Sequence, residues 1–175
     1  MDIKSAKITF RNTPRPGDGK IVRRIMKSTG FFEAVFDELD SAEANAEAIA
    51  GNPKSEEKLL FIEVGGVEEG FAIFGRESCC DATVYMSWLC VNNSLRGMGL
   101  GKRLMAEVLR QSWENNARKL ILQTSGRPQY EPTRAFYQKL GFSKEAEIAD
   151  YYTDGESTFF YTIYNPQYLA KKLKK

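Results

Sequence analysis

The sequence predicts a mixed α/β fold in which one mixed sheet carries helices on both faces. Two changes in the hydrophobic pattern lead to this prediction. Between residues 59 and 91 the apolar residues fall in short runs typical of strands, two of them joined by Gly65-Gly66, which indicates an antiparallel meander. Between residues 99 and 140 helical spacing alternates with a further strand, which indicates a parallel crossover. A single mixed sheet accommodates both patterns most simply.

The N-terminal third is expected to form a strand and two helices. The opening strand covers residues 8–10 and ends at the turn-forming sequence Pro14-Arg15-Pro16-Gly17. A helix is expected from Asp18 to Thr29-Gly30, because its apolar residues recur at helical spacing: Ile21, Val22, Ile25 and Met26. A second helix is predicted from Phe32 to about Ala50, since this stretch is rich in Ala and Glu and Gly51-Asn52-Pro53 closes it.

The remaining elements follow from the same two periodicities. Strands are predicted over residues 59–64, 71–75, 83–91 and 119–124, and near 142–148 and 157–164. Helices are predicted from about 99 to 114, from near 132 to 140, and in the lysine-rich tail 165–175. Pro132 suits a first helical turn, and Gly141 suits a helix end. The run 83–91 alternates little, so we expect a central strand covered on both faces.

Length and composition limit the possible functions. The 175 residues fit a single domain spanning 1–175. The net charge of +2, from 25 basic and 23 acidic residues, is too even to predict a nucleic-acid partner. No apolar run approaches the ~20 residues of a membrane span, and Met1-Asp2-Ile3-Lys4 begins no apolar signal segment. We therefore expect a cytoplasmic protein without a membrane partner.

The chain contains no histidine, which excludes Ser-His-Asp and Cys-His catalysis and histidine-based zinc sites. Its cysteines are Cys79, Cys80 and Cys90, too few for a four-cysteine metal site, so we expect no metal. Their odd number and the adjacent pair predict reduced thiols, with Cys90 as a small buried hydrophobe.

A glycine-rich turn separates the central strand from the helix after it. Its sequence is Arg96-Gly97-Met98-Gly99-Leu100-Gly101-Lys102-Arg103. Alternating glycines let the backbone approach a ligand closely, and the first amides of a helix favour an anion. The cations at this helix end oppose the helix dipole, a penalty that a bound polyphosphate would reverse. The spacing fits neither a Walker loop nor a dinucleotide fingerprint.

Two segments resemble motifs of the GNAT N-acyltransferase superfamily. Residues 88–101, ending in Arg96-Gly97-Met98-Gly99-Leu100-Gly101, are similar to its acyl-CoA signature [RQ]-x-x-G-x-[GA]. Residues 132–142, Pro-Thr-Arg-Ala-Phe-Tyr-Gln-Lys-Leu-Gly-Phe, resemble its second motif at the usual separation. The resemblance covers roughly the whole chain. It implies an α+β fold with a central, mostly antiparallel mixed sheet of about six or seven strands, flanked by helices on both faces.

The resemblance also implies roles for individual residues. The Leu89 N–H would donate to the thioester oxygen, and Tyr137 would protonate the departing thiolate. The turn amides would hold the pyrophosphate of coenzyme A, and the end of the central strand would pair with its pantetheine arm. The residues expected to bind coenzyme A are Leu89, Cys90, Val91, Arg96, Gly97, Met98, Gly99, Leu100, Gly101, Lys102, Thr124, Thr133, Phe136 and Tyr137.

Two positions depart from the family pattern. Many members carry a glutamate four residues before the oxyanion donor, where this chain has Tyr85, so the general base does not carry over. Glu33, Glu63 and Asp150 are candidates. Many members also carry an asparagine seven residues before the tyrosine, where this chain has Tyr130. We expect Thr124, Ser125 or Thr133 to make the contact with coenzyme A that this asparagine makes in other members. We interpret Tyr130 as a feature of a subgroup of the family.

The sequence therefore predicts an acetyl-CoA-dependent N-acetyltransferase that transfers an acyl group directly to a primary amine. The acceptor is expected to be a small molecule or a peptide, contacted by aromatic residues at Phe31, Phe32, Phe36, Tyr151 and Tyr152, with Asp150 beside the tyrosines. Two alternatives remain: a non-catalytic acyl-CoA sensor or scaffold of the same fold, and a nucleotide-binding protein using the same turn. Homodimers are common in the family, so a homodimer is a further expectation.

Overall fold

The computed structural model describes residues 6–32 and 37–172. Their elements are, in order, β1 (Ile8–Arg11), α1 (Asp18–Ser28), α2 (Glu38–Gly51), β2 (Glu57–Val64), β3 (Val67–Arg76), β4 (Thr83–Val91), the 3-10 turn η1 (Asn93–Leu95), α3 (Leu100–Glu114), β5 (Lys119–Ser125), the 3-10 turn η2 (Pro128–Tyr130), α4 (Glu131–Lys139), β6 (Ser143–Thr153), β7 (Glu156–Tyr164) and α5 (Pro166–Lys172).

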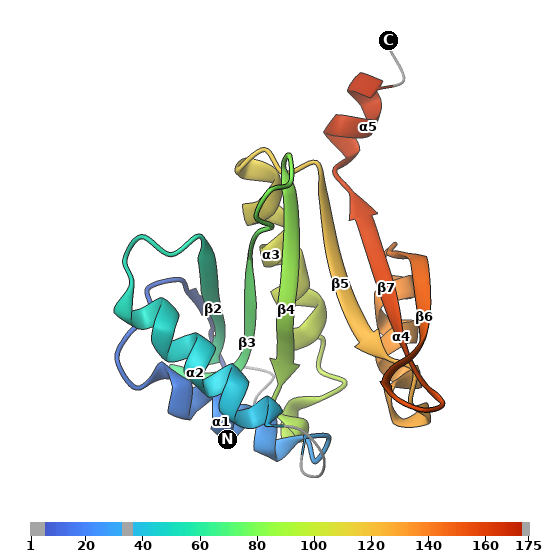
Figure 1. The fold of residues 1–175 in the computed structure, drawn as a ribbon. Coiled ribbons are helices and arrows are strands. Elements are labelled where there is room, and N and C mark those ends of the chain that lie inside the picture. Colours follow the sequence, from blue (N-terminus) through green and yellow to red (C-terminus); the bar gives the residue numbers. More distant parts are fainter. Residues whose placement is uncertain (1–5, 33–36, 173–175) are drawn as a thin grey trace. The chain divides into compact units, whose positions relative to one another are not determined.

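The described strands form one seven-stranded sheet in the order β1-β2-β3-β4-β5-β7-β6 (Figure 1). β4 and β5 are parallel, and the pairs β1–β2, β2–β3, β5–β7 and β6–β7 are antiparallel. The predicted hairpin is β2–β3, and the strand expected to be central is the fourth of the seven. The prediction of a mixed, mostly antiparallel sheet is confirmed.

The chain divides into two compact units. Unit 1 consists of the described residues of Met1–Gly75 and Trp88–Val108, and unit 2 of those of Arg76–Ser87 and Leu109–Lys175. β4 and α3 each contribute residues to both units.

In unit 1 both faces of the sheet are covered. Leu59 and Phe61 of β2 belong to a buried cluster formed with α1, α2 and β3, and Figure 1 shows α1 and α2 on the same side of β2 and β3. Leu60 and Ile62 are also fully buried, although strand alternation directs them to the opposite face. The part of α3 in this unit buries an apolar stripe of its own: Leu100, Leu104, Met105 and Val108.

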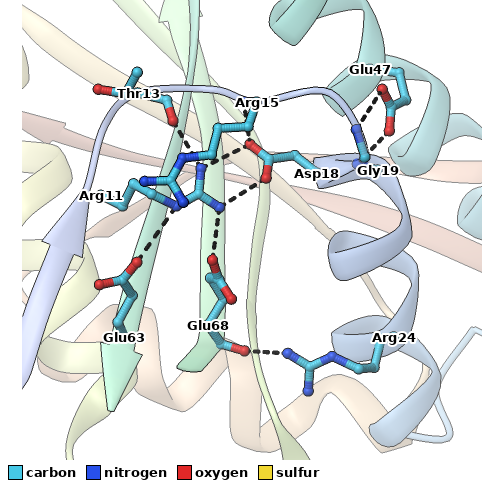
Figure 2. Close-up of polar contacts among 10 residues, drawn as sticks. Arg11, Thr13, Arg15, Asp18, Gly19, Arg24, Glu47, Glu63 and Glu68 are labelled. Atoms are coloured by element: carbon cyan, nitrogen blue, oxygen red, sulfur yellow. Dashed lines mark hydrogen bonds and ion pairs between the residues drawn. The ribbon is translucent and has the colours of Figure 1, made fainter. Parts of the chain in front are cut away.

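A buried arginine at the end of β1 joins four elements of unit 1 (Figure 2). The Arg11 guanidinium donates to both carboxylate oxygens of Asp18 at 2.8 and 3.0 Å and to Glu68 Oε1 at 3.0 Å, and its Nε lies 3.5 Å from Glu63 Oε1. Burial alone would lower the pKa of Arg11, but the hydrogen bonds and charges of Asp18 and Glu68 outweigh it and raise this pKa above its ordinary value. The cluster attaches β1 and the start of α1 to the β2–β3 hairpin.

The second helix begins later than the sequence predicts. α2 begins at Glu38, where the Asp37 carbonyl accepts from the Ser41 N–H at 2.7 Å, and not at Phe32. Phe32 lies before the helix and packs edge-on against Trp88, with 6.1 Å between ring centroids. Alanine and glutamate favour a helix without fixing its first residue, which depends here on tertiary contacts. The predicted sites Glu33 and Phe36 lie outside the described residues.

In unit 2, β7 pairs with both β5 and β6, and α4 packs on β7 through Tyr137 and Tyr161, whose ring centroids are 6.0 Å apart. β6 continues to Thr153, beyond the predicted 148, and nearly all of its residues are exposed. Within residues 6–32 and 37–172, none of the helices has both the length and the apolar content needed to cross a membrane.

Candidate functional site

The end of β4 is held firmly within unit 1. Asn92 follows the strand, donating its N–H to the Glu69 carbonyl at 2.8 Å and its Nδ2 to the Glu69 carboxylate at 2.7 Å. The Asn92 Oδ1 accepts from the Ser94 N–H at 3.2 Å and so begins η1. These contacts determine where the chain leaves the sheet and enters the glycine-rich turn.

The turn itself exposes its backbone. Gly97 and Gly99 have φ values of +78° and +79°, which side-chain-bearing residues rarely adopt. A Cβ built on either residue would meet no atom within 4 Å. The Gly99 carbonyl accepts the Arg103 N–H at 3.1 Å, so α3 begins at Leu100 and its first amides have no partner four residues back. The turn is therefore an open cradle of N–H groups at the positive end of a helix.

Three cations surround this cradle. Arg96, Lys102 and Arg103 are exposed, and within the described part of the chain their side chains form no hydrogen bond or ion pair with another residue. The Arg96 guanidinium instead lies 4.6 Å from the centroid of the Phe31 ring. Open backbone donors and cations without carboxylate partners suit the diphosphate of coenzyme A, so these residues fit that ligand.

The strand residues before the turn divide between two faces. Trp88 and Cys90 contribute to the buried cluster under α1 and α2, whereas Leu89 and Val91 alternate to the other face and are half-buried. Burial raises the pKa of the Cys90 thiol from 9.0 to about 12, although the charge of Arg96 and a backbone hydrogen bond from Val91 oppose this rise. Cys90 can therefore offer a ligand only its backbone, whereas its thiol belongs to the core.

Tyr137 lies in an aromatic cluster of unit 2. Its side chain is only 6% exposed, and its ring centroid lies 5.4 Å from Phe136, 5.7 Å from Phe142 and 6.0 Å from Tyr161. Thr133 and Phe136 are half-buried on the same helix, and Thr124 is buried near the end of β5. The rings around Tyr137 restrict its orientation.

The segment between β5 and α4 is braced by a residue that sequence reasoning missed. Arg134 donates through Nη1 to the carbonyls of Ser125 at 2.8 Å and Arg127 at 3.0 Å. Glu156 accepts from Ser125 Oγ at 3.0 Å and forms an ion pair with Arg127 at 2.7 Å. Arg134 lies within the second motif, three residues before Tyr137, and this position was the available signal for it.

The candidate bases with described side chains have structural partners. Glu63 accepts from Thr9 Oγ1 at 2.9 Å and belongs to the Arg11 cluster. Asp150 Oδ1 accepts the Gly155 N–H at 2.6 Å and so holds the β6–β7 turn. Burial, with smaller contributions from Tyr151, Tyr152 and Glu77, raises the pKa of Tyr85 from 10.0 to about 12. The Tyr85 phenol is therefore neutral at physiological pH and does not replace the family glutamate as a base.

The predicted site residues thus fall into two groups. The strand end Leu89, Cys90 and Val91 and the turn 96–102 lie in unit 1, whereas Thr124, Thr133, Phe136 and Tyr137 lie in unit 2. Among the described residues, the structure contains no group of three or more His, Cys, Asp or Glu side chains that could hold a metal ion.

Comparison with known proteins identifies the family. The family model of the acetyltransferase (GNAT) domain matches residues 55–144, just over half of the chain. N-alpha-acetyltransferase 30 from Schizosaccharomyces pombe is 28% identical over 80 residues, which make up 46% of this chain and 52% of that protein. The matched segment therefore spans about half the length of this curated relative.

Solved structures agree with this match. A GNAT-family protein from Desulfovibrio desulfuricans is 30% identical, with a TM-score of 0.84 over 90% of this chain and 99% of that chain. The yncA protein from Salmonella typhimurium, solved with acetyl-CoA, is 19% identical with a TM-score of 0.68 over 91% of this chain and 94% of that chain, a likeness of fold alone. The chain belongs to the GNAT acetyltransferase family.

Proposed function

We propose that this protein is an acetyl-CoA-dependent N-acetyltransferase that transfers the acetyl group directly from the thioester to an amine. The observation that supports this most strongly is the open turn at Gly97 and Gly99, which leads into the N-terminus of α3 in a chain of this family. Coenzyme A would supply the activated acyl group as a thioester. The protein would supply binding, orientation and proton transfer.

Each proposed role rests on a feature of its own unit. The N–H groups of the turn 96–102 bind the diphosphate, and the Leu89 N–H donates to the thioester oxygen, a contact of the kind worth ~3 kcal/mol to a transition state. The amine nitrogen forms a bond to the acyl carbon while the carbon–sulfur bond breaks. Tyr137 then gives its phenolic proton to the departing thiolate, and its burial among aromatic rings holds it in place for this step. The surplus proton on the acylated nitrogen passes to solvent water, from which the Tyr137 phenolate recovers its proton.

We further propose that the acceptor is an α-amine. An amine must lose its proton before it attacks, and at pH 7 this costs roughly 4–5 kcal/mol for a lysine but only about 1 kcal/mol for an α-amine. Among the candidate bases with described side chains, Glu63 and Asp150 have structural partners, and the Tyr85 phenol stays neutral. These observations favour the acceptor with the smaller cost of deprotonation. The name of the relative N-alpha-acetyltransferase 30 supports the same acceptor class.

Calorimetry and a thiol-release assay test this proposal. We expect acetyl-CoA to bind the wild-type protein, and short peptides with a free N-terminus to release coenzyme A faster than N-acetylated peptides with an internal lysine. No binding at millimolar acetyl-CoA would refute the enzyme. Faster turnover of the blocked lysine peptides would refute only the acceptor class.

One observation favours a second candidate, an acyl-CoA sensor or scaffold without catalysis. Tyr85, with its raised pKa, stands where many relatives carry the glutamate that takes the amine proton. Acetyl-CoA binding without thiol release across a panel of peptides, small amines and aminoglycosides would establish this alternative.

A further inference from the structure

The segment after α1 is attached to the segment that carries the glycine-rich turn. The Ser28 Oγ accepts the Asn93 N–H at 3.0 Å, Phe32 packs edge-on against Trp88, and the Phe31 ring lies under the Arg96 guanidinium. All these residues belong to unit 1. Residues 28–32 therefore contact the strand end, η1 and the first residue of the turn.

The contact with Phe31 leaves the donors of Arg96 available. The Arg96 Cζ lies over the Phe31 ring, 4.6 Å from its centroid, and a guanidinium carries five N–H donors, more than one ring face can engage. The Arg96 side chain has no hydrogen bond or ion pair to other residues in the described ranges. An arginine held over a ring loses rotational freedom and keeps N–H donors for a phosphate.

The backbone around Phe31 supports this arrangement. The Thr29 Oγ1 donates to the Met26 carbonyl at 2.7 Å and accepts the Phe31 N–H at 3.3 Å. Thr29 is only 8% exposed, so this bond pair lies in a protected position directly before Phe31. The end of α1 thus fixes the backbone from which the Phe31 ring reaches Arg96.

The geometry points to Phe31 as a positioning residue for coenzyme A: its ring holds the Arg96 guanidinium in the orientation that binds the diphosphate. This inference rests on the proposed function. It assigns Phe31 to coenzyme binding, whereas the sequence predicted only a contact with the acceptor.

A double-mutant cycle tests the inference, with the dissociation constant of coenzyme A measured by calorimetry for Phe31→Leu, Arg96→Ala and the double variant. We expect Phe31→Leu to weaken binding about two- to tenfold, because coenzyme A must then order a freely rotating Arg96 side chain. In the Arg96→Ala background Phe31→Leu should have no further effect. Phe31→Tyr, which keeps an aromatic face, should bind as the wild type does.

A second readout separates positioning from a general loss of structure. In turnover assays Phe31→Leu should lower kcat/KM for acetyl-CoA and leave it unchanged for S-acetylpantetheine, which has no diphosphate. Equal losses for both donors, or additive effects in the cycle, would overturn the inference while the proposed function stands. A wild-type protein that binds no coenzyme A would overturn both.

Discussion

Substituting Gly99 by alanine is expected to separate coenzyme binding from stability. The substitution places a methyl group at φ +79°, which costs an L-residue about 1–2 kcal/mol, while the smaller freedom of the unfolded chain returns about 0.4–1 kcal/mol. Since the new Cβ meets no atom within 4 Å, no clash adds to this cost. We therefore expect a loss of about 1 kcal/mol in the free energy of unfolding.

The effect on coenzyme binding should be much larger. The methyl group would project into the open space that the turn offers to the diphosphate. Losing one hydrogen bond to a charged group costs about 1.5–3 kcal/mol, so the dissociation constant of coenzyme A should rise about ten- to hundredfold. Calorimetry measures this constant, and urea unfolding measures the stability.

Gly155 provides a matched control. It has the same φ of +79°, and a Cβ there would also meet nothing within 4 Å, but it lies in the β6–β7 turn. Gly155→Ala should lose the same stability as Gly99→Ala and keep the coenzyme affinity of the wild type. Equal affinities for the two variants would refute the role given to the turn.

Further predictions concern charge, proton transfer and pH. Arg11→Met should lower the free energy of unfolding by about 3–5 kcal/mol at pH 7, because it leaves buried carboxylates without their partner. Arg110→Met, at an exposed helical pair, should cost about 0.3–0.5 kcal/mol, and similar urea midpoints for the two variants would contradict this. Tyr137→Phe should lower kcat for thiol release about hundredfold or more, and unchanged turnover would exclude Tyr137 as the acid. Because burial raises the pKa of Cys90 from 9.0 to about 12, the unfolded thiol ionises first, and stability should fall as pH rises through this range. Cys90→Ala should reduce that fall in urea titrations, and parallel curves for the two proteins would show that Cys90 contributes nothing.

Much of the fold could be predicted from local patterns. Residues 83–91 form β4 as expected. A long apolar run typical of a central strand can be recognised from its own residues, without knowledge of the strands that pair with it. The later start of α2 and the extension of β6 to Thr153 could not be predicted in this way. Nearly all of β6 is exposed, so burial does not mark where the strand ends, and its end depends on the turn that Asp150 and Gly155 close.

The candidate site shows the same division. The glycine-rich turn was predictable because its properties depend on residues adjacent in the sequence. Glycine permits the positive φ values, and the first turn of a helix leaves its amides unpaired. The contact of Phe31 with Arg96 joins residues far apart in the sequence, and Arg134 binds carbonyls that only the folded segment brings to it. The structural partners of Glu63 depend on the register between β1 and β2, which no periodicity reveals.

The central claim is that backbone N–H groups after β4 bind the diphosphate of coenzyme A. Titration of ¹⁵N-labelled protein with coenzyme A, followed through the amide resonances, tests it most directly. We expect the largest downfield shifts at Gly97, Gly99 and Gly101, with smaller changes at control glycines such as Gly155. Saturable binding that leaves these three amides unshifted would contradict it.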